Sequence, residues 1–227
     1  MIPLKDDNPT SSRPVVTYFL IGLCVVVFLV QIGSQSYKTG QLFYSYGLIP
    51  SVLMGHDQLP IDLYAVPAYL TIFTSMFMHG GWIHLIGNMW YMKIFADNIE
   101  DNLGPINFII FYILCGIGAA IAQVLMDTHS QVPMVGASGA IGGVLGAYLL
   151  NHPNARILVL IPYIIITIIK IRALYVLGFW FILQFISTGG GVAYAAHIGG
   201  FISGMILILF FNKKIKKKNK VIKGPWG

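Results

Sequence analysis

Apolar runs of membrane-spanning length constrain the fold of this 227-residue chain more than any other feature. Hydrophobic residues make up 56% of the sequence and charged residues only 10%, which leaves too little polar surface for a water-soluble globule. Because a helix rises about 1.5 Å per residue, each run has roughly the length that crosses a membrane. The six runs are 15–33, 82–96, 105–126, 137–150, 173–187 and 192–211. The sequence therefore predicts an all-α membrane protein with six transmembrane helices.

Two segments between these runs need a separate interpretation. The long connection at 34–81 is aromatic and amphipathic with glycine and proline breaks, and we expect short helices in the extracytoplasmic interface there. The apolar stretch at 157–169 contains Pro162 and many β-branched residues, which makes it a poor helix. We expect it to form a loop near the membrane surface.

The basic residues orient the predicted bundle, because Lys and Arg near helix ends stay on the cytoplasmic side. With six spans both termini share one side, and the opposite side keeps only Lys38. That shared side holds Lys5, Arg13, Lys93, Arg156, Lys170, Arg172 and the lysines of KKIKKKNKVIK. We therefore expect a cytoplasmic N-terminal segment at 1–14 and a basic cytoplasmic tail at 212–227.

The tail is expected to anchor on anionic lipid rather than to bind nucleic acid. Because no organelle transit segment is recognised, a prokaryotic plasma membrane is the simplest expected location. The sequence makes no prediction of the oligomeric state.

Four of the polar residues within the predicted spans stand out, because such groups are costly at membrane depth and usually line a cavity or a polar cluster. His84 and Asn88 are four residues apart, so both project from one face of the second span. Ser138 opens the fourth span and His197 lies near the start of the sixth. A single intramembrane His or Asn more often holds helices together, so the grouping is what indicates a functional site.

Small residues predict that the fourth and sixth spans pack closely. One narrow face of the fourth span consists of Ser138, Gly142 and Gly146. The matching face of the sixth span consists of His197, Gly200 and Gly204. Since both spans start on the extracytoplasmic side, the Ser138 hydroxyl and the His197 imidazole should lie at the same depth. This is the arrangement that a serine–histidine nucleophile needs.

Three motifs at these positions resemble the rhomboid family of intramembrane serine proteases. They are HGGWIHLIGNM at 79–89, GASG at 136–139 and AHIGG at 196–200, and the resemblance covers about 15–211, taken as the protease domain. It implies that Ser138 is the nucleophile and His197 the general base. The implied oxyanion donors are the side chains of His84 and Asn88 and the backbone N–H groups of Ser138 and Ala137.

The resemblance also implies supporting residues and a path for the substrate. The supporting residues are His79, Gly136, Gly139, Gly142, Gly200 and Gly204. Substrates would enter laterally between the second and fifth spans, and the candidate gate residues are Gly87, Phe179 and Trp180. One departure from the family is Gly142, where members often carry a bulky side chain that packs on the catalytic histidine. Another group must therefore orient His197.

The predicted function is a serine endopeptidase that cleaves single-span membrane proteins near the extracytoplasmic boundary. Neither a metal-ligand cluster nor a nucleotide fingerprint is recognised, so no cofactor or metal is expected. Two alternatives stay open. The polar residues could line the path of a small-solute transporter, or the chain could be a catalytically inactive rhomboid-like scaffold or chaperone.

Overall fold

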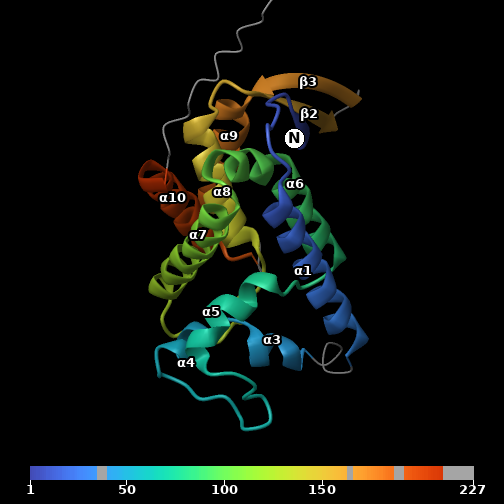
Figure 1. Ribbon diagram of the computed structural model, residues 1–227. Helices are drawn as coiled ribbons and strands as arrows, with labels where there is room; N and C mark the ends of the chain where they lie inside the picture. Colours follow the sequence, from blue (N-terminus) through green and yellow to red (C-terminus); the bar gives the residue numbers. More distant parts are fainter. Residues whose placement is uncertain (35–39, 163–165, 187–191, 212–227) are drawn as a thin grey trace, which may run out of the picture.

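The computed structural model describes residues 1–34, 40–162, 166–186 and 192–211, and within these ranges the chain is mostly helical (Figure 1). A helix lies at each predicted apolar run. These helices are α1 (Val15–Gly33), α6 (Trp82–Leu103), α7 (Pro105–Met126), α8 (Ser138–Asn151), α9 (Ala173–Ile186) and α10 (Tyr194–Phe211). The basic tail predicted at 212–227 lies outside the described residues.

Three of the described helices, α1, α7 and α10, are both long enough and apolar enough to cross a membrane. Helix α6 has 22 residues, but its second half carries Lys93, Asp97, Glu100 and Asp101. Helices α8 and α9 have only 14 residues each, or about 21 Å of helix. The structure therefore supports a membrane protein with several apolar helices, and the prediction of six spans is taken up below as a proposal.

Helix α8 lies at the centre of the bundle, where it packs against α6, α7, α9 and α10 (Figure 1). Every residue from Gly139 to Tyr148 is buried. A Cβ atom on Gly200 would overlap the backbone of Gly139, and one on Gly204 would overlap the backbone of Gly143. Backbones this close leave no room for side chains, which is how small residues pack helices in membranes.

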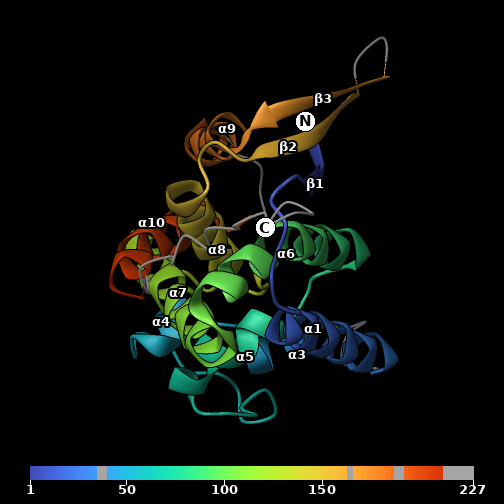
Figure 2. The same cartoon turned by 45° about the horizontal axis from the view of Figure 1, so that its top comes forward.

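A small antiparallel sheet covers one end of the bundle, so the all-α prediction is wrong there. Its strands are β1 (Ile2–Asp6), β2 (Arg156–Pro162) and β3 (Ile166–Arg172), in the order β1-β2-β3 (Figure 2). The loop predicted at 157–169 is mostly this β2–β3 hairpin. Its β-branched residues favour strands, and Ile157 and Val159 alternate into the core with 0% exposure. β-branching alone argues against a helix and does not distinguish a loop from a strand.

The N-terminal segment is fixed to the helices rather than extending freely. The Trp90 indole N–H donates to the Pro3 carbonyl at 2.6 Å. The Tyr148 hydroxyl donates to the Asp6 carboxylate, also at 2.6 Å. Strand β1 is therefore attached to both α6 and α8.

A buried carboxylate caps the start of α1, where Pro14 supplies no side-chain cap. Glu100 of α6 is 2% exposed and accepts from the backbone N–H groups of Val16 at 2.9 Å and Thr17 at 2.8 Å. It also accepts from the Thr17 hydroxyl at 2.7 Å. A carboxylate at a helix N-terminus both satisfies free N–H groups and complements the helix dipole.

We expect Glu100→Ala to lower the free energy of unfolding by about 3 kcal/mol, because it leaves buried donors unpaired. Unfolding in mixed detergent micelles would measure the loss. The matched control is Asp101→Ala, whose bonds to Ser11 and Ser12 are exposed, so it should cost about 1 kcal/mol or less. Equal losses in the two variants would contradict the capping role.

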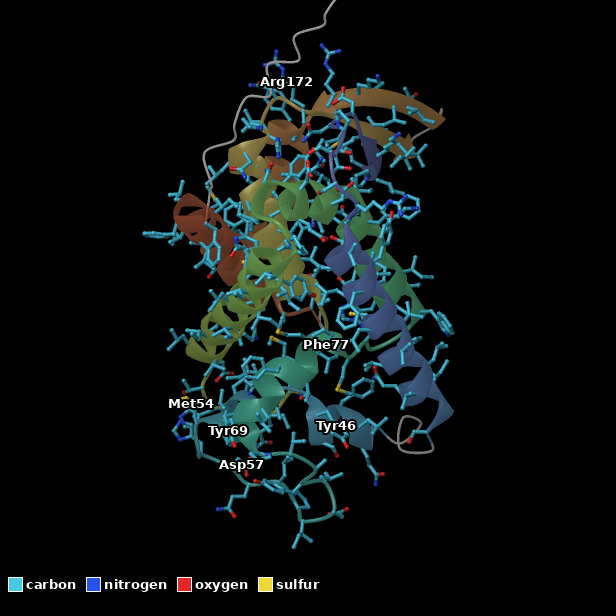
Figure 3. The ribbon with its side chains drawn as sticks, viewed as in Figure 1. Tyr46, Met54, Asp57, Tyr69, Phe77 and Arg172 are labelled. Atoms are coloured by element: carbon cyan, nitrogen blue, oxygen red, sulfur yellow. The ribbon has the colours of Figure 1, made fainter. Side chains whose placement is uncertain are left out.

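Short helices gather at the end of the bundle opposite the sheet. They are α3 (Gln41–Tyr46), α4 (Pro50–Leu53) and α5 (Thr71–Thr74). Figure 3 shows Tyr46, Tyr69 and Asp57 at this end and Arg172 at the sheet end. Lys5, Arg156 and Lys170 also lie at the sheet end, where they line a second cavity. The described basic residues are thus concentrated away from the short helices.

Candidate active site

Ser138 and His197 are in direct contact. Ser138 is the first residue of α8 and His197 lies in the first turn of α10, and the distance from Ser138 Oγ to His197 Nε2 is 2.8 Å. Both side chains are half-buried. The glycine contacts between α8 and α10 hold the two helices close enough for this bond. The structure therefore brings together the two residues that the spacing in the sequence had paired.

Gly142 of α8 faces the backbone of α10 and not the side chain of His197. A Cβ atom on Gly142 would lie 3.0 Å from the His197 carbonyl oxygen and 3.5 Å from the Phe201 nitrogen. A side chain at position 142 would therefore require the α10 backbone to move away, which is consistent with the glycine noted in the sequence.

Helix α9 supplies the other contacts of the His197 ring. The Gln184 amide oxygen is 2.8 Å from Nδ1 of His197. The Trp180 ring lies over the imidazole with 5.8 Å between centroids and 33° between planes. Our sequence reasoning missed Gln184. The available signal was a single glutamine in the apolar helix ALYVLGFWFILQFI, but only His, Asn and Ser had been considered within the spans.

The hydrogen-bonded pair of Ser138 and His197, here called the dyad, faces a cavity of about 1020 Å³. Besides Ser138 and His197, its lining includes His84, Gly87, Asn88 and Trp180. Phe179, the third candidate gate residue, is 45% exposed and is not among the described residues that line this cavity. The structure thus brings Gly87 and Trp180 to the cavity and leaves Phe179 on the outer surface of α9.

Gly136 brings His84 close to the dyad. Its φ of 128° lies in a region that favours glycine, and its N–H donates to the Ser75 carbonyl at 2.9 Å. A Cβ atom at this position would lie 2.7 Å from the His84 ring and 3.6 Å from Ser138 Oγ. Glycine is therefore required both for the backbone conformation and for the approach of the imidazole.

His84 carries a donor on the side that faces Gly136. The Gly80 N–H donates to His84 Nδ1 at 3.4 Å, so the neutral ring keeps its proton on Nε2. Nε2 is one of the two His84 atoms that a Cβ on Gly136 would touch. An N–H group of this histidine consequently lies beside Gly136, close to the region of the Ser138 hydroxyl.

Asn88 lies one turn further along α6 and is 8% exposed. Its Nδ2 atom is buried and has no hydrogen-bond partner among the described residues. Leaving such a donor unpaired costs about 1–3 kcal/mol, so an unpaired amide in a cavity calls for a functional explanation. One explanation would be that the Asn88 amide donates to an anion that forms only during a reaction.

The start of α8 adds backbone donors, because the first N–H groups of a helix have no partner within it. Ala137 is the N-cap residue and is fully buried, and the positive end of the helix dipole lies here. His84 and Asn88 line the same cavity as Ser138, so side-chain and backbone donors occur in one region of the structure. Among the described residues, no group of three or more His, Cys, Asp or Glu side chains could hold a metal ion.

His79 contacts His84, and no contact within the described residues joins it to Ser138 or His197. It is fully buried, and its ring meets the His84 ring edge-on with centroids 5.2 Å apart. Its backbone N–H donates to the Gln31 side chain at 3.1 Å, and its carbonyl accepts from that side chain at 3.3 Å. Gln31 of α1, which the sequence analysis did not single out, thus fixes the approach to α6.

The fold and the site define a helical membrane protein in which a serine hydroxyl is hydrogen-bonded to an imidazole beside a cavity. Comparison with known families gives a narrower assignment. A model described as a rhomboid domain matches residues 66–214, so the chain belongs to the rhomboid family. This confirms the resemblance inferred from the three motifs. The protein is accordingly a multi-pass integral membrane protein.

Individual relatives come from distant organisms. The chain is 31% identical to RHOMBOID-like protein 5 of Arabidopsis thaliana over 60% of its length. It is 30% identical to Rhomboid protease GluP of Bacillus subtilis over 86% of its length. It is 26% identical to Rhomboid protein 1, mitochondrial, of Saccharomyces cerevisiae over 68% of its length. The chain spans only 42%, 34% and 45% of these relatives, respectively.

Proposed function

We propose that the protein is an intramembrane serine endopeptidase that cleaves single-span membrane proteins near the extracytoplasmic boundary. The observation that carries this proposal is the 2.8 Å contact between Ser138 Oγ and His197 Nε2, beside a cavity of about 1020 Å³. Membership of a family that includes a relative named as a protease supports it. A solute path or a binding scaffold has no comparable need for a hydroxyl bonded to an imidazole.

In the proposed reaction, Ser138 Oγ attacks the carbonyl carbon of the scissile bond while its proton passes to Nε2 of His197. The carbonyl oxygen becomes an oxyanion, and its proposed donors are the side chains of His84 and Asn88 and the backbone N–H groups of Ala137 and Ser138. The imidazolium then protonates the leaving nitrogen, and the C–N bond breaks to leave an acyl ester on Ser138. Water that loses a proton to His197 then attacks the ester carbonyl, and the C–Oγ bond breaks as Ser138 Oγ takes that proton back from His197.

The proposal includes six spans, with α6, α8 and α9 joining α1, α7 and α10, and a protease domain at 15–211. Both termini would be cytoplasmic and the site would open to the other side. The concentration of basic residues at the sheet end supports this orientation. So does the Gly136–Ser75 hydrogen bond, which links the start of α8 to the short-helix end. A prokaryotic plasma membrane stays a prediction, because the relatives include a mitochondrial protein.

The proposed substrates are helices that unwind locally, because a transmembrane helix hides its peptide bonds in internal hydrogen bonds. Small or helix-breaking residues near the boundary would favour unwinding. We propose lateral access between α6 and α9, past Gly87 and Trp180, which both line the cavity. A role for Phe179 would then rest on contact with the substrate outside the cavity.

The test uses the purified wild-type chain, a fluorophosphonate probe and a model single-span substrate with a Gly/Ala-rich boundary. We expect cleavage near that boundary, with fragment masses that locate the bond. Peptide mapping should find the probe on Ser138 and not on Ser130, which lines the same cavity. Absence of both cleavage and labelling would reject the protease and favour a scaffold or transporter. Labelling of Ser130 alone would reject the proposed nucleophile.

The close packing of α8 and α10 leads to a further prediction about activity. Gly200→Val places a side chain against the Gly139 backbone, so the helices must separate and His197 must move away from Ser138. A displacement of about 1 Å costs on the order of 10² in rate, and overpacking costs about 1–3 kcal/mol of stability. Cleavage assays and unfolding would measure both losses.

The matched control is Gly22→Val, since a Cβ atom on Gly22 has no neighbour within 4 Å among the described residues. It should change the cleavage rate less than about twofold, as expected for a surface substitution of small effect. Wild-type kinetics in Gly200→Val would show that close packing is not what aligns the dyad.

A further inference from the structure

Gln184 links α9 to the imidazole of His197. Its side chain is buried, with 9% exposure, near the end of an otherwise apolar helix. The amide nitrogen donates to the Trp180 carbonyl at 2.8 Å, and the amide oxygen lies 2.8 Å from His197 Nδ1. Both ends of the amide are therefore used, and each has a defined partner.

The Trp180 carbonyl decides which way the amide points. A carbonyl oxygen only accepts, so the Gln184 nitrogen must face it and the Gln184 oxygen must face the histidine. An amide oxygen also only accepts, so His197 Nδ1 must carry the proton. The neutral ring then has its lone pair on Nε2, the atom that is 2.8 Å from Ser138 Oγ.

This tautomer is the one that a general base requires. With the opposite tautomer, Nε2 would already carry a proton and could not accept that of Ser138. The amide oxygen also stays in place when the ring becomes an imidazolium, because Nδ1 donates in both protonation states. The contact therefore survives the proton transfer.

Position 142 of α8 supplies no side chain for this task, because it is a glycine whose Cβ position already lies 3.0 Å from the His197 carbonyl oxygen of α10. Trp180 covers one face of the imidazole, and Tyr194 meets it edge-on with centroids 6.4 Å apart. These rings limit tilting but do not select a tautomer. Among the described contacts of His197, only Gln184 acts on Nδ1.

We propose that Gln184 is the positioning residue of this site: it holds His197 in the base tautomer and in the orientation that faces Ser138. The inference rests on the proposed protease function. It assigns the orientation of His197 to a neutral amide on α9, a role for which the sequence analysis named no residue.

The test compares two replacements of Gln184 in the full chain. Gln184→Met keeps the length of the side chain but removes the acceptor, so we expect kcat to fall about 10-fold to 100-fold with little change in KM. Gln184→Glu keeps an acceptor opposite Nδ1 and should recover kcat to within about threefold of wild type. The rate of fluorophosphonate labelling should follow kcat in both variants.

Ile182→Met controls for changes to α9 itself, because Ile182 is 55% exposed on the same helix. It should keep the wild-type kcat, KM and unfolding midpoint. A purely structural role for Gln184 would predict that both variants lose activity in proportion to stability, with no recovery in Gln184→Glu. That pattern, or an unchanged kcat in Gln184→Met, would overturn the inference.

The two proposals fail in different ways. A wild-type chain that neither cleaves nor labels would overturn the protease, and the inference with it. Wild-type cleavage that persists in Gln184→Met overturns the positioning role alone. If Gln184→Met does not fold, Gln184→Glu decides: near-wild-type kcat supports the acceptor, and a loss as large as that of His197→Ala excludes it.

Discussion

Ser138→Ala is expected to lower kcat for a single-span substrate by a factor on the order of 10⁴ or more. The substitution removes the only oxygen bonded to His197 Nε2 among the described residues, and with it the acyl intermediate. The fold should persist, because only one half-buried oxygen atom is lost. Fragment quantification over long incubations would give the residual rate, and the unfolding midpoint would show that the variant is folded.

Ser203→Ala is the matched control for this loss. Ser203 lies on α10, on the side where its hydroxyl approaches Gly118 of α7. It is not among the described residues that line the cavity. We expect cleavage within about twofold of wild type, as for other substitutions of small effect. Cleavage by Ser138→Ala at an undiminished rate would mean that another nucleophile acts.

Asn88→Ala is expected to lower kcat by about 10²–10³ with a smaller change in KM. The reason is that the buried Asn88 Nδ2 has no partner among the described residues, so its hydrogen bond is available for an oxyanion. Losing a donor that binds only the transition state lowers kcat, whereas losing ordinary substrate contacts raises KM. Steady-state kinetics in detergent would separate the two cases.

Asn98→Ala is the control for removing a buried amide from the same helix. Asn98 donates to the Asn8 carbonyl at 2.9 Å and fixes the N-terminal segment. It should therefore lower stability by about 1 kcal/mol and leave kcat unchanged. A change confined to KM in Asn88→Ala would assign Asn88 to substrate binding and leave the oxyanion to His84 and the backbone.

The helices and the dyad could be predicted from the sequence because both depend on local pattern. Apolar runs gave α1 and α7 with the observed bounds. The spacing of glycines around Ser138 and His197 indicated which helices pack. The sheet could not be found this way, since β1 pairs with a strand about 150 residues away. Local hydrophobic periodicity does not reveal which distant segment a strand pairs with.

The sequence also could not predict which way side chains on α9 point or which group the Gln184 amide contacts. Phe179 and Trp180 are adjacent, so they project about 100° apart on α9, and apolar character alone does not reveal which one faces the cavity. Gln184 stands out as a polar residue in an apolar helix, but its partner depends on how α9 packs against α10. Gly142 was a useful clue because it showed that His197 needed a different support.

The β2–β3 hairpin has a consequence for how the proposed protease would open. It joins α8 to α9, and β3 ends at Arg172, where α9 begins at Ala173. The start of α9 is thus tied to a sheet, so the opening that we propose between α6 and α9 would be a tilt about this end. Gln184 is about 16 Å along the helix, so a tilt of about 10° carries it about 3 Å. In the proposed protease, such a swing would separate Gln184 from His197 and leave the base without its positioning residue, so hydrolysis would require α9 to return.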